Sequence, residues 1–277
     1  MDNLENILEK IQSLIVVHGD MKSALPLCLE AVGMGSPEAQ RILGNLFLWG
    51  AVNKKQDTSN AFKWWKIAAD NGDAEACLLV GGIYYTGELG EKNYNLAYKY
   101  ISESVKKYYA TLDEDESSKK DYVNYGKALG YLSMFLYNGF GCQRNYDLAY
   151  YYAELGAKED DSTSLLILGY CFLEGDGVKE DDEKAYACFS KGAALGSKAC
   201  QKAIDENFED DNEYGEQGET NEDEELEDGD YDYPYEPIDA PGPYDDEDFD
   251  PYADDIDAMD DGGGPDYGYR DDADYDE

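Results

Sequence analysis

The side chains that could carry out acid–base, nucleophilic or metal chemistry are few in this sequence, or lack a pattern. His18 is the only histidine, which argues against His-based catalytic triads, Cys–His dyads and multi-histidine metal sites. It precedes Gly19 at the end of a stretch with helical periodicity, so we expect it to cap that helix. The six cysteines form no CxxC pair, which disfavours a zinc site or a redox motif. We expect reduced thiols that are mostly buried.

Carboxylates are abundant, but no pair of them stands out as a general acid and base. Asp228, Asp230 and Asp232 are spaced like the first ligands of a calcium loop. Tyr233 occupies the position where such a loop requires glycine, and Asp239 replaces its final glutamate, so we reject an EF-hand. The sequence also contains no GxGxxG or P-loop motif. We therefore expect no catalytic residue, no cofactor and no metal site.

The formal net charge of −41 is divided unevenly along the chain. Residues 205–277 contain 34 acids and one base, Arg270, whereas residues 1–204 have a net charge of −8. Neither part offers the basic surface that nucleic acid or an anionic membrane needs. No stretch approaches the roughly 18 apolar residues of a membrane span, and the N-terminus lacks the features of a secretory signal. We expect a cytoplasmic protein whose partners are proteins or peptides.

Residues 209–277 form an acidic tail that is rich in tyrosine, proline and glycine. With few aliphatic side chains, it cannot bury enough apolar surface to offset the entropy of ordering, so we expect it to be disordered. One interpretation is a highly charged, disordered segment whose only role is to keep the protein soluble. The alternative is that tyrosines among the acids contact a basic, partly apolar protein surface, in the manner of a nucleic-acid mimic or a chaperone.

The sequence repeats a pattern of helical residues four times. Each unit begins with an aliphatic residue and a small one, continues with an aromatic residue or leucine and a glycine, and later has an alanine. The leading pairs are Leu43-Gly44, Val80-Gly81, Leu132-Ser133 and Leu168-Gly169, and the alanines are Ala61, Ala97, Ala149 and Ala185. The leading residues are 37, 52 and 36 positions apart. The surplus in the middle interval predicts an insertion near residues 109–123.

Each unit is interpreted as two helices, with the small residue allowing close approach and the glycine ending the first helix. Such a pair cannot bury its apolar face alone, so neighbouring pairs must stack. Residues 1–38 fit a degenerate capping repeat, after which Ser36 and Pro37 begin a helix as N-cap and first residue. Residues 39–208 form the rest of the solenoid and end in a capping helix. We predict an all-α superhelical solenoid of about five helix pairs, followed by the tail.

These positions together resemble the Sel-one-like repeat, a relative of the tetratricopeptide repeat, over roughly residues 20–200. The fourth unit carries the pattern most fully, at Leu168-Gly169, Phe172, Gly175, Gly177, Lys184-Ala185, Phe189 and Gly196. The second and third units depart from it at Tyr108, Ser133, Leu155 and Asp160. The resemblance implies a right-handed α/α superhelix that acts as an adaptor, and it implies no catalytic residue.

In the related tetratricopeptide helices, residues two before, two after and five after the leading aliphatic residue line a groove. The corresponding positions here include Arg41, Asn45, Leu48, Leu78, Tyr85, Met134, Tyr137, Tyr170 and Leu173. This set is neutral except for Arg41, which suits an extended or helical peptide with apolar anchors. The alternative is that some of these side chains pack against the adjacent helix. We expect a non-enzymatic scaffold or adaptor, and the competing hypothesis is a tail that binds or shields a basic protein.

Overall fold

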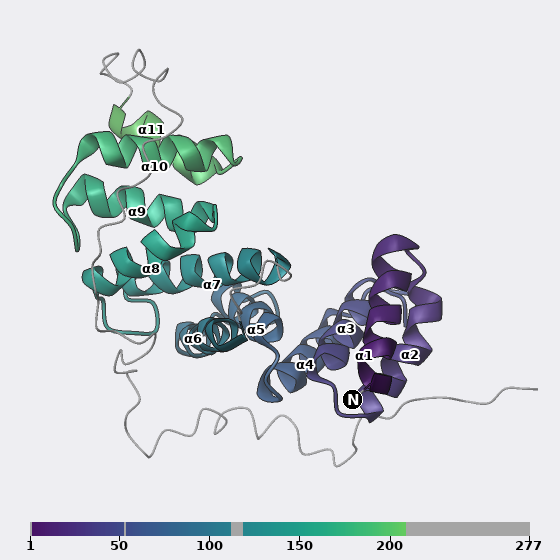
Figure 1. Cartoon of the computed structure of the whole chain (residues 1–277). Coiled ribbons are helices and arrows are strands. Elements are labelled where there is room, and N and C mark those ends of the chain that lie inside the picture. Colours follow the sequence, from purple (N-terminus) through teal and green to yellow (C-terminus); the bar gives the residue numbers. More distant parts are fainter. Residues whose placement is uncertain (1, 53, 112–118, 209–277) are drawn as a thin grey trace, which may run out of the picture. The chain divides into compact units, whose positions relative to one another are not determined.

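The computed structural model describes residues 2–52, 54–111 and 119–208, all within the first of two compact units, Met1–Pro243 (Figure 1). Every regular element in these ranges is helical, which confirms the all-α prediction. None of the helices described in them is both long enough and apolar enough to cross a membrane. The predicted disorder of residues 209–277 lies outside the described residues, as do the three aspartates that resemble a calcium loop.

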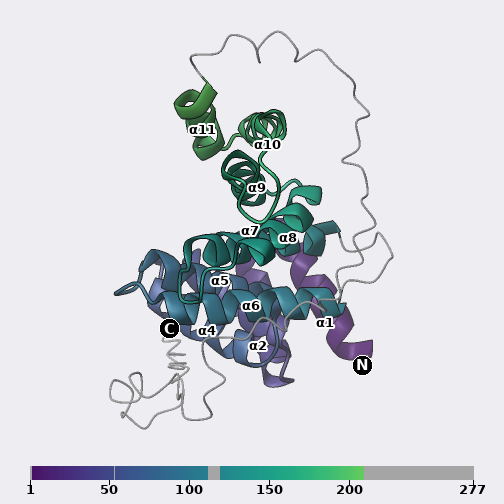
Figure 2. The same cartoon turned by 90° about the vertical axis from the view of Figure 1, so that its left-hand side faces the viewer.

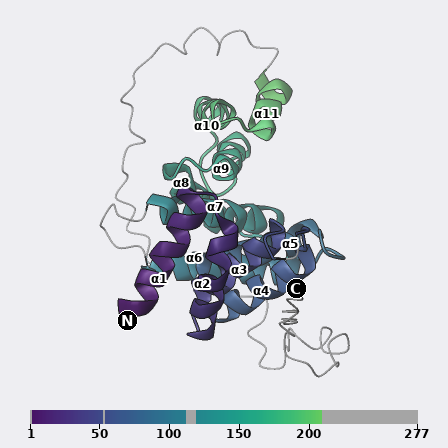
Figure 3. The same cartoon turned by 90° about the vertical axis from the view of Figure 1, so that its right-hand side faces the viewer.

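In the described ranges the helices form five consecutive pairs, as predicted, and one further helix follows them. The pairs are α1 (Asp2–Gln12) with α2 (Met21–Gly33), α3 (Pro37–Leu48) with α4 (Thr58–Asp70), α5 (Ala74–Thr86) with α6 (Tyr94–Thr111), α7 (Lys119–Asn138) with α8 (Tyr146–Lys158), and α9 (Ser162–Glu174) with α10 (Asp182–Ala194); α11 (Lys198–Phe208) follows. Each helix packs against the next along the chain, and α7 also packs against α9. Figure 2 and Figure 3 show the same neighbours from two further sides.

Short polar side chains begin the helices by accepting hydrogen bonds from backbone N–H groups that have no partner inside the helix. The hydroxyl of Ser36 accepts from the Ala39 amide at 3.2 Å, and Pro37 is the first residue of α3, so the predicted helix start is confirmed. Asp73 and Asp161 cap α5 and α9 in the same way, with hydrogen bonds of 2.7 and 2.8 Å. These caps therefore fix where several of the pairs begin.

Glycines end helices and bring neighbouring pairs into close contact. Gly87 and Gly175 are the left-handed C-caps of α5 and α9, with φ angles of 72° and 71°, a conformation that glycine adopts at low cost. Two residues after Gly175, Gly177 lies against the carbonyl of Tyr146 at the start of α8, where a Cβ atom would clash. Glycine at this position thus allows the α9–α10 pair to dock closely on the α7–α8 pair.

The periodic positions form the core. The four alanines of the repeat are fully buried, and the four leading aliphatic residues are at most 2% exposed. A Cβ atom at Gly81 would lie 2.8 Å from Ile101 of α6, so the small residue permits close helix packing, as predicted. In the third unit Ser133 replaces this glycine, and its buried hydroxyl donates a hydrogen bond to the Gly130 carbonyl at 2.9 Å.

Two helices are longer than their equivalents near residues 109–123, where the spacing predicts an insertion. Helices α6 and α7 contain 18 and 20 residues, against 13 in each of α8, α9 and α10. Residues 112–118 between α6 and α7 lie outside the described ranges. Elsewhere a tight turn joins one helix pair to the next, as between α4 and α5. Between α6 and α7, the rings of Tyr108 and Tyr125 pack with centroids 6.4 Å apart.

The first helix packs against α2, the second helix of its own pair. Ile11 is fully buried and Ile7 is 8% exposed, which agrees with the helical periodicity of the sequence before His18. A single π-helical turn, Ser13–Val17, continues α1, and the backbone N–H of His18 closes it by donating to the Ile15 carbonyl. The lone histidine is therefore a helix C-cap, as predicted.

Candidate peptide-binding face

The nine predicted groove positions lie on the first helix of four pairs: α3, α5, α7 and α9. Two of these side chains are buried, because Arg41 is 8% exposed and Leu78 is 9% exposed. They pack against neighbouring helices, which was the alternative interpretation. The other seven are partly exposed: Asn45, Leu48, Tyr85, Met134, Tyr137, Tyr170 and Leu173. That these seven bind a ligand stays a prediction.

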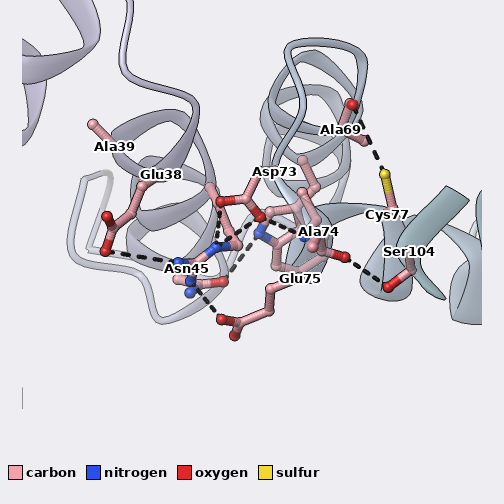
Figure 4. A network of polar contacts seen from close by, with 12 residues as sticks. Glu38, Ala39, Asn45, Ala69, Asp73, Ala74, Glu75, Cys77 and Ser104 are labelled. Carbon is pink, nitrogen blue, oxygen red and sulfur yellow. Dashed lines mark hydrogen bonds and ion pairs between the residues drawn. The ribbon is translucent and has the colours of Figure 1, made fainter. Parts of the chain in front are cut away.

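Arg41 joins α3 to the start of α5 by ion pairs with Asp73 and Glu75, the carboxylates labelled in Figure 4. Its guanidinium lies 2.9 Å from Asp73 and 3.0 Å from Glu75, and Glu38 on α3 is 3.9 Å away. Burial by itself lowers the pKa of Arg41, but the three carboxylates outweigh it, so this pKa is raised. Arg41 is therefore a charged structural residue, and the seven partly exposed positions carry no formal charge.

The junction between α7 and α9 contains an equivalent carboxylate in a different setting. Asp161 accepts hydrogen bonds from the amide and the hydroxyl of Ser164, at 2.8 and 2.9 Å. It lies against Gly130, which has the position in α7 that Arg41 has in α3, and a Cβ atom on Gly130 would overlap the carboxylate. Within the described ranges no cation forms an ion pair with Asp161, and burial raises its pKa.

Partly exposed tyrosines and one methionine form a row across α5, α7 and α9. We call this row the aromatic face, and it consists of Tyr85, Tyr131, Met134, Tyr137 and Tyr170. The Tyr85 and Tyr131 rings have centroids 6.1 Å apart, and the Tyr85 hydroxyl lies 3.7 Å from the sulfur of Met134. Met134 and Tyr137 are one helical turn apart, and the Tyr170 ring centroid is 6.5 Å from that of Tyr137. The row thus connects three successive pairs.

Two exposed cations flank the aromatic face. The ammonium of Lys92 lies 6.0 Å from the centre of the Tyr85 ring, and the guanidinium of Arg144 lies 5.6 Å from the centre of the Tyr146 ring. The Tyr146 ring in turn packs against Tyr137, with centroids 5.3 Å apart. Such cation–π contacts are each worth about 0.5–1 kcal/mol at exposed sites. They place positive charge at the edge of the face.

The groove rule carried over from tetratricopeptide helices misses Tyr131, Lys92 and Arg144. Tyr131 stands one residue before the leading Leu132, a position that the rule omits, and both cations lie in loops. A sequence signal for the cations exists, because Lys92-Asn-Tyr94 and Arg144-Asn-Tyr146 are the same motif, 52 residues apart. This interval equals that between the leading residues of the second and third units.

The described residues offer little to metal or thiol chemistry. All six cysteines are free and five of them are buried, as predicted. Burial raises the pKa of Cys28, Cys77, Cys171 and Cys188 to about 12, so these thiols are protonated and weakly reactive at neutral pH. Within the part of the chain that the structure describes, no three His, Cys, Asp or Glu side chains are grouped to hold a metal ion.

One family model matches the repeats of this chain. The Sel1 repeat model matches residues 37–73, 74–107, 126–161 and 162–197. A 68-residue stretch is 29% identical to Chitin synthase regulatory factor 1 of Schizosaccharomyces pombe, and the match covers 24% of this chain and only 15% of that protein.

Among solved structures, a Sel1 repeat protein from Oxalobacter formigenes superposes with a TM-score of 0.56 at 21% identity, over 73% of this chain and 77% of the other. This likeness confirms the predicted solenoid. A protective antigen with an SLR fold from uropathogenic Escherichia coli has a TM-score of 0.38 at 21% identity, over 75% of this chain and 50% of the other.

Proposed function

Because the chain belongs to the Sel1 repeat family, whose four repeats cover just over half of its residues, we propose that it is a non-enzymatic scaffold. It binds a peptide or protein segment along α3, α5, α7 and α9. Sel1 repeats generally serve as protein–protein interaction modules, which supports a scaffold role without naming the partner. The free thiols fit a reducing compartment, so we place the scaffold in the cytoplasm.

The observation that carries this proposal is the row of seven partly exposed, uncharged side chains at equivalent positions on the first helices of four successive pairs. Asn45 is held in place there, since its side-chain oxygen accepts a hydrogen bond from the Trp65 indole at 3.0 Å. The remaining six are leucine, tyrosine and methionine, residues that supply apolar contact area. Aromatic and methionine side chains are enriched at protein interfaces, and apolar anchors at regular spacing suit a helix or an extended segment.

A capture experiment on the full chain tests the proposal. The variants Leu48→Glu and Leu173→Glu place a charge at the two ends of the row, on α3 and α9. We expect a partner of the face to remain bound at high salt, because screening weakens ionic contacts but not apolar ones, and to be lost from both variants. The matched control is Val17→Glu, a valine that is 72% exposed outside the row. Partners that bind both leucine variants as well as they bind the wild type would contradict the proposal.

A second candidate function rests on the tail, because residues 205–277 contain 34 acids and a single base. Such a polyanion attracts basic protein surfaces and shields them from nucleic acid. Partners of the tail should be basic, should leave the full chain as salt rises, and should be absent when residues 209–277 are deleted. Partners retained by the truncated chain at high salt instead favour the scaffold.

A further inference from the structure

The chain contains a segment whose composition matches the aromatic face. Residues 233–243, YPYEPIDAPGP, contain four of the six prolines that follow residue 208, and only two acids. Pro234 and Pro237 form a P-x-x-P motif; such motifs favour the extended polyproline II conformation and dock onto aromatic side chains. The segment lies outside the described residues and is known by its sequence alone.

The aromatic face offers the complementary groups. Its tyrosines are partly exposed, and a tyrosine ring presents an apolar surface on which proline can pack. Lys92 and Arg144 are exposed at its edge, and the segment carries two acids, Glu236 and Asp239. The segment and the edge of the face therefore carry opposite charges, although the chain as a whole is acidic.

We propose that residues 233–243 bind the aromatic face of the same chain. The 24 residues between Phe208 and Tyr233 have a root-mean-square span of about 25–30 Å. Helix α11 packs against α9 and α9 packs against α7, and packed helices are about 8–10 Å apart. The Tyr85 ring on α5 lies a further 6.1 Å from that of Tyr131 on α7, so the distance to be bridged is about 20–30 Å. A linker whose span matches the distance gives a millimolar effective concentration.

Self-binding makes the binding of an external partner to the aromatic face competitive, because the partner must displace the segment before it can bind. This inference rests on the proposed function only because both use the same surface. It needs no external partner. Either can therefore fail without the other.

The test uses a fluorescein-labelled peptide of residues 233–243 added to full-length proteins, with binding followed by fluorescence anisotropy. In one protein, the proline variant, the internal segment is disabled by Pro234→Ala, Pro237→Ala, Pro241→Ala and Pro243→Ala. We expect the peptide to bind the proline variant at least about tenfold more tightly than the wild type, because the wild-type face is already occupied.

Further substitutions in the proline variant locate the site. Lys92→Glu with Arg144→Glu, both exposed, and separately Tyr131→Ala should each weaken peptide binding several-fold. Tyr109→Ala should leave binding unchanged, because Tyr109 is 57% exposed and lies outside the face. Equal binding to the wild type and the proline variant, or no binding to either, would overturn the self-binding proposal. Loss of an external partner from Leu173→Glu would still support the scaffold.

Discussion

The α3–α5 junction and the α7–α9 junction place a buried carboxylate at equivalent positions but balance it differently. Asp73 and Asp161 both cap the first helix of a repeat, and burial raises the pKa of each. At Asp73 the guanidinium of Arg41 opposes this shift. At Asp161 the facing residue is Gly130, and the carboxylate depends on Ser164. One junction is held by charge and the other by close packing.

This difference shows what a solenoid requires of a junction. The helix cap is needed in both places, so a carboxylate recurs and must be buried. A buried carboxylate can be balanced by a cation, or it can be tolerated where hydrogen bonds and tight packing compensate. The two solutions predict different responses to substitution.

The largest expected effect is that of Arg41→Ala. The substitution leaves Asp73 without its cation, and breaking a buried ion pair on one side typically costs about 3–5 kcal/mol. Urea denaturation followed by circular dichroism measures the loss. Lys191→Ala is the matched control, since Lys191 lies 2.8 Å from Asp160 but both side chains are more than half exposed. That pair should contribute about 0–1 kcal/mol, and similar losses in both variants would show that burial does not matter here.

Gly130→Ala should be the next most damaging substitution. The added methyl group would overlap the Asp161 carboxylate, and overpacking a buried site costs about 1–3 kcal/mol. Gly82→Ala serves as the reference, because Gly82 is also in a helix but nothing lies within 4 Å of its added Cβ atom. That change should stabilise the protein by about 0.4–1 kcal/mol. If both glycine variants gain stability, close packing is not what holds the α7–α9 junction.

The helix pairs could be predicted from the sequence, whereas the junctions could not. Core positions such as Leu168 and Ala185 can be predicted from local spacing, because each lies on the face of its helix that packs against a neighbour. This face is buried in every repeat of a stacked solenoid. Whether Arg41 faces solvent depends on Asp73, which is 32 residues away. A tetratricopeptide register therefore places Arg41 on the open face, where seven of its nine positions are partly exposed. The acidic Asp73-Ala-Glu75 motif one repeat later was the available signal for its burial.

The same substitution should act in opposite directions at the two junctions. Because the pKa of Asp161 is raised in the folded chain, the folded protein holds this proton more readily than the unfolded chain, and the ionised form costs stability at neutral pH. Asp161→Asn keeps a helix cap and should raise the melting temperature at pH 7. Burial raises the pKa of Asp73 as well, but Asp73→Asn should lower the melting temperature, because it leaves the buried guanidinium of Arg41 without its closest carboxylate.

Acid should remove the benefit of Asp161→Asn. As the pH falls from the raised pKa of Asp161 to below its ordinary value of 3.8, the wild-type carboxyl becomes neutral in both states. The melting temperatures of the wild type and Asp161→Asn should therefore converge over this interval. A benefit that persists at the lowest pH would mean that burial of the charge is not its cause.

The smallest expected effect concerns the junction between α6 and α7, where the rings of Tyr108 and Tyr125 pack together. The Tyr108 hydroxyl is buried without a hydrogen-bond partner among the described residues, and burial raises the pKa of Tyr108. Tyr108→Phe removes a group that gains nothing from being buried, so stability should stay the same or rise by up to about 1 kcal/mol. Tyr150→Phe is the matched control, because the Tyr150 hydroxyl donates a hydrogen bond to the Glu154 carboxylate at 3.2 Å. Its loss should cost about 1 kcal/mol, and a comparable loss in Tyr108→Phe would reveal a stabilising contact of the Tyr108 hydroxyl.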